Sequence, residues 1–346
     1  MIRNAKPEMT RRRFENMPPL RAGNVPLVRS IRLTPSGLWL CFLVAATTLL
    51  LAGRIRAQES TSAIDQSRLY PRTAPPTAGN LAPDTLSMPQ GETVVSEDES
   101  FGAQQILKTE EKIPDFLITA GSSVYFTNNV ALTRSGEQSE AFSVSEAAFS
   151  WSPRLSPQWQ FQLGGALALF RYETSALDFE SLGTGAGWIW TPPNFWGIAF
   201  LSRYDFVELL DRHSNQILQD HEFSIGAQKI VVLGRSHWLT FGLIGSAGIS
   251  DPETEQRDQA GFGLGYHLQL SRQFAADLGY RHSWYFYNRG GRTDLNQVLS
   301  LGLHYNFRPW VALNGYLSGA TNWSNKEVFK YDVFSGGGGL GLIIRF

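Results

Sequence analysis

The sequence predicts an all-β fold, a closed antiparallel transmembrane β-barrel of about 12 strands preceded by a disordered N-terminal linker. Three observations predict it. Long stretches alternate apolar and polar residues with the period of two that a strand requires. These stretches recur at short intervals up to the end of the chain. Aromatic residues make up 12% of the 346 residues and there are 33 Gly, which suits strands with aromatic ends and tight turns.

Residues 1–57 are predicted to be a signal peptide that is cleaved on export. A basic lead precedes the apolar run at residues 38–52, which is too short for a comfortable membrane span. Cleavage after Ala57 would leave Ile55 and Ala57 at the usual recognition positions. A retained N-terminal anchor is the alternative.

Cleavage would change the charge of the chain. Residues 1–57 hold ten of the 30 Lys and Arg and two of the 31 Asp and Glu, which leaves 20 basic and 29 acidic residues. We therefore expect no nucleic-acid partner. The single cysteine, Cys41, would leave with the signal, so the mature chain would have neither a disulfide nor a thiolate for metal binding or catalysis.

Residues 58–112 are predicted to be a flexible periplasmic segment, because Pro, Ser, Thr and acidic residues leave too few apolar side chains to offset the entropy of ordering. One tract differs. Residues 101–113 carry Phe101, Ile106 and Ile113 on a polar background, which suits either a short helix that enters the barrel as a plug or a segment that is ordered only locally.

The predicted barrel occupies residues 113–346. Around residue 265, Phe262, Leu264 and Tyr266 alternate with glycine and histidine, so one face would meet lipid and the other water. Strands of ten or more residues match the ~9–11 needed to cross a bilayer at a tilt. Twelve strands are expected, with centres near residues 121, 146, 165, 185, 201, 226, 243, 265, 279, 301, 315 and 340.

The predicted connections alternate in length, which would place both ends of the barrel chain on the side of the short turns. That side would be periplasmic and the longer loops would face outward. The short turns are expected at residues 153–157, 192–194, 234–236, 271–273 and 307–309. The longer loops are expected at residues 133–140, 173–178, 208–220, 251–258, 288–294 and 322–330.

The last twelve residues read SGGGGLGLIIRF, and Leu340, Leu342, Ile344 and Phe346 share one face of a strand. Such a strand needs a partner for its edge, and pairing with the first strand would close the barrel. The stretch resembles the C-terminal assembly signal of Gram-negative outer-membrane β-barrel proteins. The resemblance implies a bacterial outer-membrane location after export, with outer-membrane lipid and the barrel-assembly machinery as partners. It leaves homo-oligomerisation open.

The polar faces of the strands predict the lining of the lumen. Acidic and basic walls that face each other would orient polar solutes in a diffusion pore. The same residues would otherwise pair and fill the interior as a structural network, since twelve strands fall between filled and wide barrels. The predicted lumen residues are Glu146, Arg203, Asp205, Glu222, Asp277, Arg281 and His304.

The favoured function is a passive channel for small polar solutes. The alternative is a non-conducting surface anchor or binding protein that uses its outer loops. An outer-membrane lipid hydrolase is disfavoured, because His282 and Ser283 are neighbours on a strand and point to opposite faces. His213, Ser214 and Asn215 fall in a predicted long outer loop, where a lone His-Ser-Asn sequence is more often a turn than a catalytic group. We expect no enzyme activity, no cofactor and no metal site.

Overall fold

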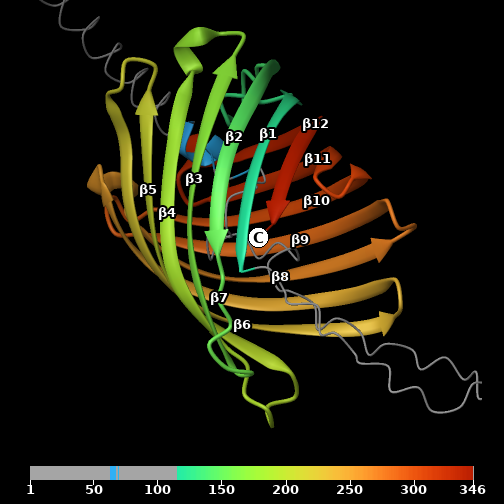
Figure 1. The fold of residues 1–346 in the computed structure, drawn as a ribbon. Coiled ribbons are helices and arrows are strands. Elements are labelled where there is room, and N and C mark those ends of the chain that lie inside the picture. The colour runs from blue at the N-terminus through green and yellow to red at the C-terminus, as the bar shows by residue number, and fades with distance from the viewer. Residues whose placement is uncertain (1–62, 68, 70–114, 346) are drawn as a thin grey trace, which may run out of the picture. The chain divides into compact units, whose positions relative to one another are not determined.

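The computed structural model describes residues 63–67, 69 and 115–345, and residues 115–345 form a closed barrel of twelve antiparallel strands (Figure 1). Each strand pairs with the next one along the chain, and the last pairs with the first. The predicted fold class and strand count are confirmed. The strands are β1 (Phe116–Thr127), β2 (Glu140–Trp151), β3 (Trp159–Tyr172), β4 (Phe179–Trp190), β5 (Ile198–Asp211), β6 (Gln216–Gly234), β7 (His237–Asp251), β8 (Arg257–Gln269), β9 (Phe274–Tyr287), β10 (Thr293–Arg308), β11 (Val311–Ser324) and β12 (Tyr331–Arg345).

The connections lie at two ends of the barrel. The near end carries the start of β1, the end of β12 and the turns at residues 152–158, 191–197, 235–236, 270–273 and 309–310. The far end carries the loops at residues 128–139, 173–178, 212–215, 252–256, 288–292 and 325–330, three of which contain short 3₁₀ helices: η2 (Ser175–Leu177), η3 (Glu253–Glu255) and η4 (Glu327–Phe329). Several near-end turns are as long as far-end loops, so the contrast in length is smaller than the sequence predicts.

The prediction of a long loop at residues 208–220 is wrong. β5 continues to Asp211 and β6 begins at Gln216. The carboxylate of Asp211 holds the turn, because its Oδ1 accepts hydrogen bonds of 2.8 Å from the backbone N–H groups of both His213 and Asn215. A short polar side chain thus stabilises a tight hairpin where charged residues suggested an open loop.

Closure of the barrel depends on the glycine run of β12. Leu117 pairs with Arg345 and Thr127 with Ser335 across the β1–β12 seam. A Cβ at Gly337 would collide with the Val124 carbonyl, and one at Gly339 would collide with Ser122 and Ser123. Glycine here therefore permits β1 to approach closely. Phe346, the last residue of the predicted assembly signal, lies outside the described residues.

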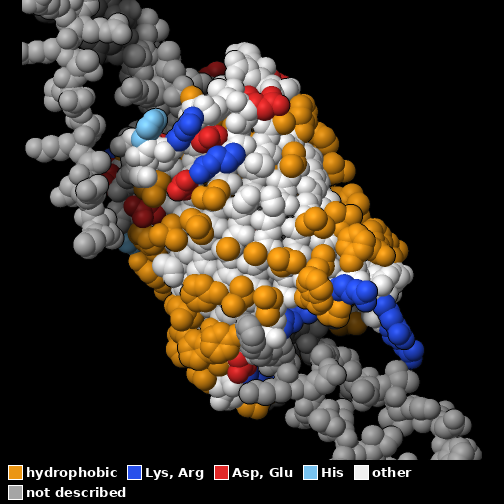
Figure 2. All heavy atoms as spheres, turned by 45° about the horizontal axis from the view of Figure 1, so that its top comes forward, with side chains coloured by type: hydrophobic (Ala, Val, Ile, Leu, Met, Phe, Trp, Pro, Cys, Tyr) orange, Lys and Arg blue, Asp and Glu red, His pale blue; other side chains and the backbone are white. Residues whose placement is uncertain are grey.

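The outer wall of the barrel is apolar. Leu264, Leu299 and Leu340 are 42%, 54% and 58% exposed, and many other large hydrophobic side chains share this face. Figure 2 shows hydrophobic side chains spread over the wall, whereas charged side chains gather near the ends. Exposure of such a surface to water is unfavourable, so the wall suits contact with lipid. In the described part of the chain, no helix is long and apolar enough to cross a membrane.

A short helix lies inside the ring of strands. Residues 63–67 and 69, here called the inner helix, appear as the blue coil in Figure 1. Ile64 is 1% exposed and Leu69 8% exposed, and both belong to the apolar cluster that fills the far end of the lumen. These residues belong to the stretch for which the sequence predicts a flexible segment. The plug predicted at residues 101–113 lies outside the described residues.

Candidate functional site in the barrel lumen

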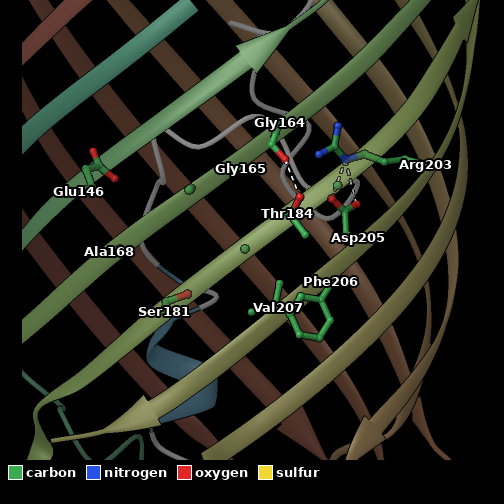
Figure 3. Close-up of a pocket in the computed structure, with 13 residues that line it drawn as sticks. Glu146, Gly164, Gly165, Ala168, Ser181, Thr184, Arg203, Asp205, Phe206 and Val207 are labelled. Atoms are coloured by element: carbon green, nitrogen blue, oxygen red, sulfur yellow. Dashed lines mark hydrogen bonds and ion pairs between the residues drawn. The ribbon is translucent and has the colours of Figure 1, made fainter. Parts of the chain in front are cut away.

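The alternation of side chains along each strand sends one set of residues into the lumen. Glycine and other small residues on β3 and β4 leave a cavity beside the wall (Figure 3). Glu146 on β2 and Arg203 and Asp205 on β5 line this cavity together with Ala168 and Ser181. Three of the predicted lumen residues are therefore brought together by four consecutive strands.

Arg203 and Asp205 form a buried ion pair. Nε of Arg203 donates to both carboxylate oxygens of Asp205, at 2.7 and 2.9 Å, and the side chains are 7% and 5% exposed. Residues two apart on a strand share a face, which explains why these neighbours meet. Gly185 makes the room, because a Cβ there would collide with both side chains. In the part of the chain that the structure describes, Nη1 of Arg203 has no hydrogen-bond partner.

Asp277 lies between two histidines. Its Oδ1 is 2.6 Å from Nδ1 of His267, and its Oδ2 is 3.2 Å from Nε2 of His304. His267 stacks on Trp238 with ring centroids 3.7 Å apart, and His304 contacts Asn314 Oδ1 at 2.9 Å. The β8–β9 register sets His267 opposite Asp277. The sequence analysis placed His304 and Asp277 in the lumen and the histidine of β8 on the water-facing side, but it did not predict the contact between His267 and Asp277.

Two predicted residues lie elsewhere on the lumen face. Glu222 on β6 is the cross-strand neighbour of Asp205. Arg281 on β9 is paired in register with Gly263 and Val298, and it interacts electrostatically with Tyr316. The lumen thus carries acidic and basic side chains at several positions along its wall.

The far end of the lumen holds the inner helix, which the sequence analysis missed. Nε2 of Gln66 donates a 2.7 Å hydrogen bond to the carbonyl of Val130, and Tyr316 Oη donates to the carbonyl of Leu69 at 3.4 Å. Ile64 packs in a cluster with the side chains of Phe170 and other residues of the far end. Few apolar residues suffice here because the barrel supplies their partners.

Next to this helix, Arg292 forms a polar cluster of its own. Its Nε donates to Oδ2 of Asp294 at 2.8 Å, and Asn322 Nδ2 donates to the same oxygen at 3.2 Å. Nη2 of Arg292 is also 4.0 Å from Oδ2 of Asp65 on the inner helix. The sequence offered little signal for this group, since Arg292 falls inside a predicted loop.

An ion cluster links two loops outside the strands. Glu327 accepts hydrogen bonds from Lys330, at 2.6 Å, and from Arg134 in the loop at residues 128–139. These bonds, first that of Lys330 and then that of Arg134, lower the pKa of Glu327. The side chains of Arg134 and Glu327 are each 64% exposed and that of Lys330 is 34% exposed, so the cluster ties the loops together without forming a buried site.

The residues weighed for hydrolysis do not meet. His282 stacks on Phe262 on the outer face, with centroids 5.1 Å apart, whereas Ser283 is 0% exposed and accepts a hydrogen bond from Gln259. His213 and Ser214 lie in the tight turn after β5. Among residues 63–67, 69 and 115–345, no group of three or more His, Cys, Asp or Glu side chains is arranged to hold a metal ion.

Comparison with known proteins supports the fold. No family model matches the sequence. No curated protein matches it either. An outer membrane channel from Pseudomonas putida F1 is similar over 67% of this chain and 96% of its own, with 10% identity and a TM-score of 0.51. The translocator domain of autotransporter NalP from Neisseria meningitidis matches over 68% of this chain and 90% of its own, with 13% identity and a TM-score of 0.38. The chain shares the closed β-barrel fold of the Pseudomonas putida F1 channel.

Proposed function

We propose that this chain is an outer-membrane channel for small polar solutes, with the inner helix restricting its far end. One observation carries the proposal: an apolar outer wall encloses a lumen lined by charges of both signs, with a cavity beside Arg203 and Asp205. Fixed charges along a narrow passage favour polar solutes over apolar ones. The proposal includes export by a signal peptide, insertion by the barrel-assembly machinery and no catalytic step or cofactor.

A second candidate is a non-conducting anchor whose far-end loops bind a partner. The apolar packing of Ile64 and Leu69 favours it, because this packing fills the far end of the lumen. The two functions differ in one measurable property, the passage of ions.

Reconstitution of the full chain in planar lipid bilayers tests the channel. We expect wild-type protein to conduct, and Ile64→Asp to conduct more, because a charge at this buried position expels the inner helix. Val328→Asp is the matched control, since Val328 is 72% exposed on a far-end loop and its substitution should leave conductance unchanged. Silence of both wild type and Ile64→Asp would reject the channel and favour the anchor.

A further inference from the structure

Two arginines at the far end of the lumen lie over aromatic rings. Cζ of Arg257 is 3.7 Å from the ring centroid of Tyr285. Cζ of Arg292 is 4.1 Å from the centroid of Tyr287 and 3.5 Å from that of Phe329. Stacking fixes the guanidinium plane and aims its N–H groups past the edge of the ring. Such an edge matches the geometry of a carboxylate.

A carboxylate of the chain itself lies beside Arg292. The side chain of Asp65 on the inner helix is 13% exposed, and its Oδ2 lies 4.0 Å from Nη2 of Arg292. Asp65 also interacts electrostatically with Arg257 and with the hydroxyl of Tyr331. The far end of the lumen therefore accommodates one buried carboxylate that belongs to a separate, short segment.

The remaining charges limit what else the site accepts. Arg292 pairs with Asp294, and Glu222 interacts electrostatically with Arg257. Each guanidinium thus already has an acidic neighbour on the barrel, and Asp65 adds one further negative charge. A ligand with one carboxylate would reproduce this balance, whereas a ligand with two would add an uncompensated charge.

The residues around Asp65 indicate what kind of group would accompany the carboxylate of such a ligand. Ile64 and Leu69 pack in an apolar cluster with Val130 and Leu132. The amide of Gln66 is buried, and in the described residues its Oε1 has no hydrogen-bond partner. An unmet buried acceptor weakens the hold of the barrel on the helix, which favours its exchange for another occupant.

We propose that the inner helix is a built-in substitute for a solute, and that the site around Arg257 and Arg292 binds small monocarboxylates with an apolar body. This inference names the solute class of the proposed channel and rests on that function for its biological role. The solute and the Asp65 carboxylate compete for the same two arginines. Binding of one excludes the other.

Calorimetric titration of the folded, detergent-solubilised full chain with benzoate tests the site. Benzamide serves as the neutral probe of similar shape, and phthalate as the probe with two carboxylates. Asp65→Asn should bind benzoate about tenfold more tightly than wild type, because it removes the competing charge. Benzamide and phthalate should each bind Asp65→Asn at least about tenfold more weakly than benzoate. Asp332→Asn, an exposed carboxylate at the same end of the barrel, should match wild type.

Replacement of the arginines supplies the second arm. In the Asp65→Asn background, Arg292→Gln and Arg257→Gln should each abolish measurable benzoate binding, while Arg289→Gln on the exposed loop should not. Heat-modifiable migration checks that each variant is folded. Equal benzoate affinity in wild type and Asp65→Asn, or equal binding of benzamide and benzoate, would overturn the site. Conductance without benzoate binding rejects this inference alone, whereas benzoate binding by a protein that is silent in bilayers rejects the channel alone.

Discussion

Arg203 and Asp205 form a 2.7 Å ion pair in the lumen, with both side chains on β5 and both buried. Replacement of one member leaves the other charge buried and uncompensated. We expect Asp205→Ala to lower the free energy of unfolding by roughly 3–5 kcal/mol. Urea unfolding in lipid vesicles measures this change.

Two controls separate burial from ion pairing in general. Glu180→Gln removes the half-exposed partner of Arg171 and should change stability by about 1 kcal/mol or less. The double variant Arg203→Met with Asp205→Leu should recover most of the stability, because no lone charge remains. A single variant as stable as wild type would mean that the pair is solvated.

Substitution by arginine should have different effects on stability at outward-facing and lumen-facing positions of the wall. Leu264→Arg and Leu301→Arg place a charge against lipid and should each destabilise the inserted barrel by roughly 2–4 kcal/mol near the midplane. Ser300→Arg is the control, since Ser300 faces the lumen between Gly279 and Ser318. Refolding into lipid vesicles measures all three. Equal losses of stability at the lipid-facing and the lumen-facing positions would contradict the assignment of the faces.

The strands were predictable because their signals are local. Each predicted strand centre falls inside an observed strand, since a period of two over ten or more residues defines a strand without knowledge of its partners. The hairpin after β5 was missed because its turn depends on the side chain of Asp211, while the surrounding charges resemble those of a loop.

The inner helix and the contacts within the lumen were not predictable in this way. Ile64 is buried by residues that follow it by more than 60 positions, and nothing in its own segment signals them. Parity gives the face of a side chain but not its partner, so Asp277 was assigned to the lumen while its contact with His267 was missed. Partner choice depends on register and on glycines that make room, as Gly185 does for Arg203.

The C-terminal residue tests assembly. Phe346→Asp should leave export intact but abolish barrel insertion, because it breaks the apolar row of Leu340, Leu342 and Ile344 that lines the outer face of β12. Arg345→Gln alters the adjacent position while retaining this row, and should insert normally. Heat-modifiable migration on a gel is the measurement. Normal insertion of Phe346→Asp would refute the predicted signal.

The link between far-end loops should depend on pH. The pKa of Glu327 is lowered by Lys330 and Arg134, so the link stabilises the loops above the unfolded pKa of the carboxyl and is lost as pH falls through the lower folded value. Spin labels at Ser135→Cys and Val328→Cys should report a broader distance distribution at about pH 3 than at about pH 7. The same labels with Glu327→Gln should show the broad distribution at both. An unchanged wild-type distribution would contradict the link.

Charge selectivity gives the most direct test of an open path through the lumen. Arg281 and Asp277 share the lumen face of β9, so removal of either leaves the wall with the opposite excess charge. In reconstituted channels, Arg281→Ala should shift the reversal potential toward cation preference relative to wild type, and Asp277→Ala should shift it toward anion preference. Screening is incomplete in a narrow passage, because the Debye length is ~10 Å at 0.1 M salt.

Arg289→Ala is the control for these shifts. Arg289 pairs with Glu253 on an exposed loop, where mobile ions screen both charges, so its removal should move the reversal potential far less. If the lumen were instead a paired structural network, wild-type bilayers would be silent and Asp277→Ala would lower stability, since His267 and His304 would lose their shared partner. Opposite shifts for Arg281→Ala and Asp277→Ala require ions to pass both residues, and a structural network cannot produce them.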